Sequence, residues 1–146
     1  MSRDSLTREG EIGELKTQLD LTKQGLVVSV PLTASTNGYD LICDNGSRLI
    51  KIQVKSVKIN PNNTITVPLT NRKNSSVSKN NRGQSHRYSE LVDFLAVSVK
   101  NTDMIFYLPS AILPTDRATE TFLLPEYEGR SKKIRLNQDF RLLTFP

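Results

Sequence analysis

The stretch GYDLICDNGSRLIKIQVKS, residues 38–56, decides the fold of this chain. Its segments 39–43 and 48–56 both have the composition of β-strands, and the dipeptide Asn45-Gly46 lies between them. Asn-Gly is the strongest short-range signal of a β-hairpin, because a type I′ turn requires a positive φ angle at both of its central residues. The stretch therefore predicts two antiparallel strands joined by a tight turn.

The second strand of this hairpin is predicted to have one apolar and one polar face. Successive side chains of a strand point to opposite faces of the sheet, so Gln53 and Lys55 point the same way. The tight turn brings Asp40 alongside them, and three polar groups converge on one face of the sheet. The apolar face is formed by the residues that alternate with them, Ile50, Ile52 and Val54.

These polar groups suit the hydrolysis of a phosphodiester bond, which needs an activated water and a cation held by oxygen ligands. We interpret Asp40 as the principal Mg²⁺ ligand, with the amide oxygen of Gln53 and the carbonyl oxygen of Val54 as further ligands. Lys55 would orient or deprotonate the attacking water and stabilise charge on the phosphate. The spacing alone is weak evidence, because a turn residue followed by the solvent face of an amphipathic strand also accounts for it.

Residues 5–24 have the pattern of an α-helix. Ile12, Leu15 and Leu19 recur at three- and four-residue spacing, and Gly25 stands where a helix C-cap glycine belongs. We expect this helix to lie beside the hairpin.

A glutamate of this helix is expected to complete the metal environment from the far side. Glu11 and Glu14 are three residues apart and therefore share a helix face, so the pattern leaves both as candidates for the catalytic acid. Gly10 and Gly13 weaken the isolated helix, and their expected use is to let a neighbouring backbone or a ligand come close.

Composition narrows the class of protein further. The chain has 146 residues, which fits one domain over residues 1–146, and its formal net charge of +5 favours a polyanionic partner. The lone cysteine, Cys43, excludes an internal disulfide and a structural zinc site, and fits a reducing compartment. Neither a leader peptide nor an apolar run of about 20 residues is present. We therefore expect a soluble protein of the prokaryotic cytoplasm or nucleoid without a membrane partner.

Residues 70–88, TNRKNSSVSKNNRGQSHRY, contain no acidic residue and almost no apolar residue, which predicts a mobile basic loop. One interpretation is a solvated, disordered loop without a function, and the other is a loop that contacts the DNA backbone. Arg reads guanine and Asn or Gln reads adenine through paired hydrogen bonds, so the composition also suits base readout. The predicted DNA-binding residues are Arg72, Lys73, Lys79, Asn80, Arg82, Gln84, His86 and Arg87.

The remaining segments complete a small mixed domain. We expect a short buried strand over residues 26–30, a helical turn over 88–92, core strands over 93–98 and 104–108, and a short helix over 110–113. Tyr88 is expected to close the core, and the C-terminal part to be a polar, basic tail. Together with the hairpin, these segments predict an α/β (α+β) fold, a mixed sheet of four or five strands flanked by helices, with the catalytic residues at one edge.

With these motifs in place, the chain resembles the PD-(D/E)XK nucleases. GEIGE opens a helix at residues 10–14, Gly25 follows, GYDLI spans residues 38–42, and IQVKS spans residues 52–56. The spacing is similar to that of archaeal Holliday-junction resolvases, and this similarity favours Glu14 over Glu11. The chain departs from the family pattern in having Gln53 where an acid is usual.

A closer resemblance is to the intron-encoded homing endonucleases of this fold, known from cyanobacterial group I introns, and it rests on YSELVD at residues 88–93 and FYLP at residues 106–109. It implies a site-specific endonuclease that cuts double-stranded DNA with Mg²⁺, for which Mn²⁺ could substitute. A chain of this size contacts a limited stretch of DNA, so we expect a homodimer or homotetramer. The alternatives are a structure-specific Holliday-junction resolvase, a restriction-type nuclease, and a non-catalytic DNA-binding module on a nuclease fold, which Gln53 keeps open.

Overall fold

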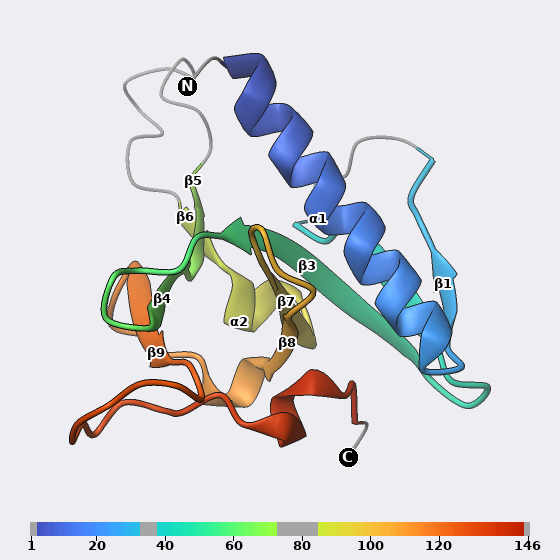
Figure 1. The fold of residues 1–146 in the computed structure, drawn as a ribbon. Coiled ribbons are helices and arrows are strands. Elements are labelled where there is room, and N and C mark those ends of the chain that lie inside the picture. The colour runs from blue at the N-terminus through green and yellow to red at the C-terminus, as the bar shows by residue number, and fades with distance from the viewer. Residues whose placement is uncertain (1–2, 33–37, 73–84, 145–146) are drawn as a thin grey trace.

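The computed structural model describes residues 3–32, 38–72 and 85–144, in which one long helix lies across a five-stranded sheet (Figure 1). The helix is α1 (Arg3–Lys23), and the strand order is β1-β2-β3-β7-β8. Strands β3 and β7 are parallel and the other neighbours are antiparallel, so the predicted mixed α+β sheet is confirmed. The strands are β1 (Val27–Ser29), β2 (Leu41–Asp44), β3 (Leu49–Val57), β7 (Phe94–Val99) and β8 (Ile105–Pro109).

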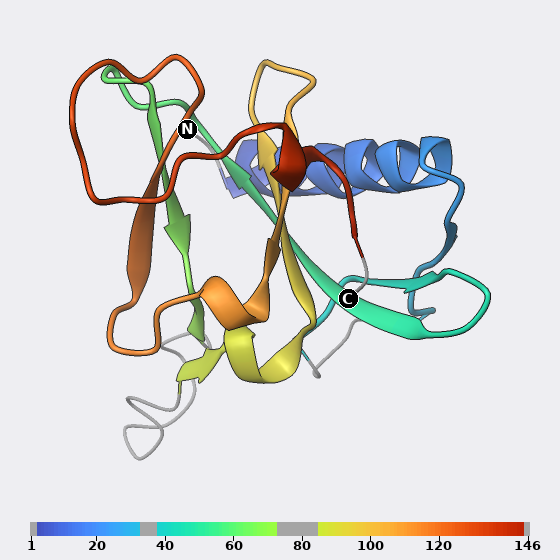
Figure 2. The same ribbon diagram turned by 90° about the horizontal axis from the view of Figure 1, so that it is seen from below.

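A second layer covers the sheet face that α1 leaves open. It is an antiparallel ribbon of β4 (Thr64–Pro68) and β9 (Thr119–Leu123), which Figure 2 shows on the other side of the sheet strands from α1. Neither strand was predicted. The expected basic tail, which contains Arg130, Lys132, Lys133 and Arg135, follows β9 and leads into a 3₁₀ helix. The smaller elements are β5 (Thr70–Arg72), β6 (Ser85–Arg87), α2 (Tyr88–Leu91), η2 (Ser110–Ile112) and η3 (Gln138–Arg141).

Strand β7 separates two hydrophobic cores. Its six residues are all buried, as expected for a strand covered on both faces. Leu95 and Val97 pack with Phe122 in the core beneath the β4–β9 ribbon. Phe94 and Ala96 pack with α1 in the other core. The strand next to β3 is therefore packed on both of its faces.

Helix α1 packs through a different face from its apolar stripe. Gly13, Thr17 and Leu21 are buried against the sheet, whereas Ile12, Leu15 and Leu19 are 44%, 63% and 57% exposed. A Cβ atom at Gly13 would overlap the Ser56 hydroxyl, and the Thr17 hydroxyl turns back to donate to the Gly13 carbonyl (2.8 Å). Close approach, and not burial of the apolar stripe, therefore sets the orientation of the helix.

The end of α1 follows the predicted C-cap. Gly25 has a φ of +85°, its N–H donates to the Thr22 carbonyl (3.0 Å), and the Leu26 N–H donates to the Leu21 carbonyl (3.2 Å). The chain then reverses into β1, which is an edge strand and not the buried strand expected, because Val27 is 65% exposed.

The hairpin of β2 and β3 is confirmed, but its turn differs from the predicted type I′. Gly46 has a φ of +92°, while Asn45 is not in the left-handed region. The Asn45 side-chain oxygen instead accepts hydrogen bonds from the N–H groups of Ser47 and Arg48, both at 2.9 Å. The side chain of Asn45 thus holds a longer turn that ends where Asp44 pairs with Leu49.

The ends of the predicted basic loop are ordered. Residues 70–72 and 85–87 pair as β5 and β6, so the segment 70–88 begins and ends as an antiparallel ribbon and is not a loop throughout. Tyr88 is buried and closes the core, as predicted. Of the helices that the structure describes, none has the length and apolarity needed to cross a membrane.

Candidate active site

The polar residues of β3 lie where this strand runs past the end of β2. Pairing between the two strands reaches Leu41 opposite Ile52, and the Asp40 N–H donates to the Ile52 carbonyl (2.8 Å). Beyond this point the β3 edge at residues 53–56 lines a pocket of about 290 Å³. The hairpin thus brings Asp40 to Gln53 and Lys55, as the sequence predicted.

Asp40 is held by the strand that carries the other polar residues. Its Oδ2 atom accepts a hydrogen bond from the Val54 N–H (2.8 Å) and another from the Gln53 side-chain amide (2.7 Å). Burial raises the pKa of Asp40, and the Val54 hydrogen bond and the charge of Lys55 partly oppose that rise. The carboxylate is therefore fixed in position while part of its charge remains uncompensated.

Glu14 of α1 lines the same pocket, whereas Glu11 does not. The pKa of Glu14 is raised, mainly by burial and to a smaller extent by the negative charges of Asp40 and Glu11. Glu14 and Asp40 therefore line one pocket, and the charge of Asp40 contributes to the raised pKa of Glu14. Glu11 is exposed, so of the two candidate helix glutamates the structure brings Glu14 to the pocket.

Lys55 lies at the side of the pocket with its ammonium group over an aromatic ring. Its Nζ atom is 5.2 Å from the centre of the Tyr88 ring, which is buried in the core beneath. The ring limits where the ammonium group can go. The positive charge of Lys55 opposes part of the rise in the pKa of Asp40. A restrained cation beside a carboxylate can orient a water molecule and a phosphate oxygen.

Gly10, which was expected to let a backbone or a ligand come close, also lines the pocket, together with three residues that were not predicted as site residues: Glu9, Ser56 and Lys100. The Lys100 ammonium group is 2.7 Å from Oε2 of Glu9, and the Ser56 hydroxyl donates to the Glu9 backbone carbonyl (3.1 Å). A signal for Lys100 was present, because it follows β7 and the carboxyl ends of parallel strands meet at one edge of a sheet.

The donor set fits a hard divalent cation. Asp40 and Glu14 supply carboxylates, and Val54 and Gln53 supply carbonyl oxygens. Among the described residues no group of three or more His, Cys, Asp or Glu side chains could hold a metal. A Mg²⁺ ion in this pocket would be held by one or two carboxylates, with water and substrate oxygens as its other ligands. The negative charge of Asp40 contributes to the raised pKa of Glu14, and a cation between the two carboxylates would relieve this repulsion.

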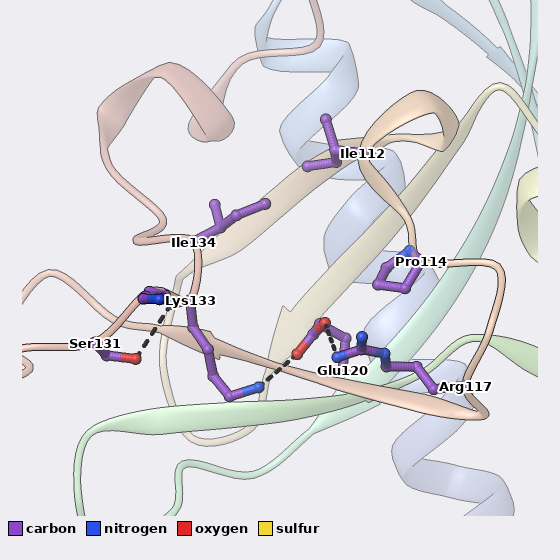
Figure 3. Close-up of a pocket in the computed structure, with 8 residues that line it drawn as sticks. Ile112, Pro114, Arg117, Glu120, Ser131, Lys133 and Ile134 are labelled. Atoms are coloured by element: carbon purple, nitrogen blue, oxygen red, sulfur yellow. Dashed lines mark hydrogen bonds and ion pairs between the residues drawn. The ribbon is translucent and has the colours of Figure 1, made fainter.

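A larger hollow of about 420 Å³ lies between η2, β9 and residues 131–134 (Figure 3). The acid in it, Glu120, is 3.1 Å from Nη1 of Arg117 and 2.8 Å from Nζ of Lys133. These contacts lower the pKa of Glu120, with the Lys133 hydrogen bond as the largest cause. A carboxylate neutralised in this way is a poor base and a poor metal ligand, so we place the candidate active site at the β3 edge.

The predicted DNA-binding residues fall mostly outside the described part of the chain. Lys73, Lys79, Asn80, Arg82 and Gln84 lie outside it. The backbones of Arg72 and His86 belong to β5 and β6. Arg87, at the end of β6, donates from Nη1 to the Arg117 carbonyl (2.9 Å), so its side chain lies beside the segment that leads into β9.

Comparison with known proteins agrees with the fold and with the resemblance seen in the sequence. The structure of a bacterial homing endonuclease, I-Ssp6803I, matches with a TM-score of 0.68 and 21% identity over 86% of this chain and 82% of that chain. Hjc, a Holliday junction resolvase from the archaeal hyperthermophile Archaeoglobus fulgidus, matches with a TM-score of 0.47 and 13% identity over 77% and 82%. A search of curated proteins gave no match. The family model for the PD-(D/E)XK endonuclease matches residues 5–143. Since that match spans almost the whole chain, the chain belongs to the PD-(D/E)XK endonuclease family.

Proposed function

We propose that this chain is a Mg²⁺-dependent endonuclease that cuts double-stranded DNA at a specific site, as a homing endonuclease does. One observation carries the proposal. The Asp40 carboxylate is held at 2.8 Å from the Val54 N–H and 2.7 Å from the Gln53 amide, in a pocket shared with Glu14 and Lys55. Carboxylates, carbonyl oxygens and an ammonium group together suit metal-assisted hydrolysis of a phosphodiester.

Asp40 and Glu14 are the proposed charged ligands of the cation, and the Val54 carbonyl is a neutral one. Both hydrogen bonds to Asp40 go to Oδ2, so Oδ1 can serve the cation. Bound there, Mg²⁺ supplies charge neutralisation at the phosphate and makes water more acidic. Lys55 orients the attacking water, or takes its proton, and stabilises charge on the phosphate.

Gln53 has two proposed roles that use the two ends of its amide. Its NH₂ group donates to Asp40 and so fixes the carboxylate. Its oxygen is available as a neutral cation ligand or to position water. An ionised glutamate at this place could not donate to Asp40, so the departure from the family pattern has a proposed physical role in this pocket.

Double-stranded DNA is the proposed substrate, and we expect the chain to act as a homodimer or homotetramer. The chain carries a formal net charge of +5, and its basic residues 72–87 are proposed to bind the phosphate backbone. Cutting both strands requires two active sites, which a symmetric dimer supplies.

The test is cleavage of a randomised DNA duplex library with Mg²⁺, with EDTA, and with two lysine variants. Lys55→Ala removes the cation in the pocket. Lys58→Ala is the matched control, because Lys58 is exposed just after β3 and does not line the pocket. We expect defined double-strand ends from the wild type, no cleavage with EDTA, and a loss of about 100-fold or more for Lys55→Ala only. Equal activity of the Lys55 and Lys58 variants would refute the assignment.

A non-catalytic DNA-binding module is the second candidate, because Gln53 removes one negative charge from the site and already binds Asp40. Retention of the library on a filter, with no cleavage in Mg²⁺ or Mn²⁺, would favour it. A four-way DNA junction in the same assay separates a structure-specific nuclease from a sequence-specific one.

A further inference from the structure

We propose that Lys100 binds a DNA phosphate next to the one that is cleaved, and that Glu9 positions its ammonium group. The inference rests on the proposed function, since it assigns a contact with the substrate to the same pocket. The observation behind it is that Lys100 lines the pocket of Asp40 and Glu14 while its ammonium group is 2.7 Å from Oε2 of Glu9.

Lys100 is placed by the parallel pairing of β3 and β7. Lys55 lies beside Val97 in this pairing, and Lys100 comes three residues later. At about 3.3 Å per residue the two lysine backbones are offset by roughly 10 Å along the sheet. The Lys100 N–H donates to the Val57 carbonyl (2.8 Å), which fixes its backbone to the end of β3. The offset lets the two lysines reach different phosphates of one strand.

The Lys100 ammonium group is restrained but still accessible. The side chains of Lys100 and Glu9 are 26% and 33% exposed. The Glu9 backbone is itself anchored, because its carbonyl accepts the Ser56 hydroxyl at 3.1 Å. Glu9 therefore holds the lysine at the pocket without burying it, which lowers the entropy lost when the ammonium group meets a phosphate.

Charge also favours a phosphate contact. Of the described residues that line the pocket, the acids are Glu9, Glu14 and Asp40, and the cations are Lys55 and Lys100. A polyanionic backbone that enters this pocket meets repulsion unless cations flank the acids. A lysine ammonium group is a compact point charge that binds phosphate without a fixed orientation.

A purely structural role for Lys100 makes a different prediction. The ion pair joins α1 to the end of β7, but α1 is also held there by Lys16, whose Nζ donates to the Thr102 carbonyl (3.1 Å). Partly exposed ion pairs contribute little to stability. Thermal melting would register a structural role, and only a phosphate contact would change how DNA binding depends on salt.

The experiment measures binding of a random-sequence DNA duplex in Ca²⁺, between 50 and 200 mM salt, for the wild type and four variants. Lys100→Met removes the charge. Lys100→Gln removes it but retains a donor for Glu9, which serves if the methionine variant fails to fold. Lys100→Arg retains the charge. Lys23→Met is the matched control, since Lys23 lies in the last turn of α1 and does not line the pocket.

One lost phosphate contact lowers the slope of log affinity against log salt by about 0.9. Over this fourfold range of salt, wild-type affinity should therefore fall about 3.5-fold more than that of Lys100→Met or Lys100→Gln. Lys100→Arg and Lys23→Met should keep the wild-type slope. A wild-type slope in both charge-removing variants overturns the inference, even if the wild type cleaves DNA. A reduced slope upholds it even if no DNA is cut, and a wild type that binds no DNA overturns both proposals.

Discussion

Replacing Gly13 with alanine should destabilise the protein, although alanine is the better helix former. Gly13 lies where α1 crosses β3, and a Cβ atom there would overlap Oγ of Ser56. Gly10 is one turn earlier on the same helix, and a Cβ atom there meets nothing within 4 Å. The two glycines are therefore a matched pair that separates helix propensity from packing.

The magnitudes decide the sign at each position. Alanine gains about 1 kcal/mol over glycine in a helix interior. At Gly13 the overlap costs about 1–3 kcal/mol, and turning the Ser56 hydroxyl away gives up its hydrogen bond to the Glu9 carbonyl, worth about 1 kcal/mol. We expect Gly13→Ala to lower the free energy of unfolding by about 1–3 kcal/mol, and Gly10→Ala to raise it by about 0.5–1 kcal/mol.

Urea denaturation of a double-mutant cycle tests the cause. Ser56→Ala removes the hydroxyl that the new Cβ atom would meet, and the neighbouring Cβ atom of Ser98 is at an ordinary contact distance of 3.5 Å. In that background Gly13→Ala should become stabilising, with a coupling energy of about 2–4 kcal/mol from the overlap and the hydrogen bond together. The reasoning is refuted if Gly13→Ala stabilises the protein as much as Gly10→Ala, or if its effect is the same with and without Ser56.

Two further predictions concern the charges in the pocket. Gln53→Glu replaces the amide that donates to Asp40 with a second negative charge. Melting in EDTA should therefore show a free energy of unfolding that is lower by about 1–3 kcal/mol, and Mg²⁺ should restore it. A loss of stability that Mg²⁺ leaves unchanged would contradict this prediction. Glu14→Gln should weaken Mg²⁺ binding in calorimetry and raise stability by up to about 1 kcal/mol at pH 7. The pKa of Glu14 is raised in the folded state, so its ionised form opposes folding above that pKa, and the gain should vanish at a pH low enough to protonate Glu14 in both states. Glu11→Gln, the matched control, should change both quantities less.

The candidate site could largely be predicted because three of its residues come from one hairpin. Asp40, Gln53 and Lys55 are placed by local rules, namely a turn signal and the two-residue period of a strand. These rules hold even though the turn itself was wrong in detail, since the pairing of Asp44 with Leu49 sets the register. Local sequence therefore predicts which of these side chains meet in the pocket.

The orientation of α1 could not be predicted, because its apolar residues indicate a helix but not the face that packs. Ile12, Leu15 and Leu19 identified the element correctly, yet they face away from the sheet. The packed face has no side chain at Gly13, where the helix passes Ser56. Gly13 therefore marks the face that packs on the sheet, but a search for apolar periodicity does not count glycine.

The ribbon under the sheet and Lys100 were missed for a common physical reason. Strands β4 and β9 pair Ile65 with Phe122, residues far apart in the chain, and neither strand has a turn signal that joins it to the other. Glu9 and Lys100 likewise meet only because α1 lies over the end of β7. The proposed catalytic groups of the hairpin follow from local sequence, whereas the contact between Lys100 and Glu9 depends on the packing of two distant elements. Substrate contacts beyond the hairpin residues are therefore best sought among the residues that line the pocket of the folded protein. The salt dependence of DNA binding by the Lys100 variants tests one such contact.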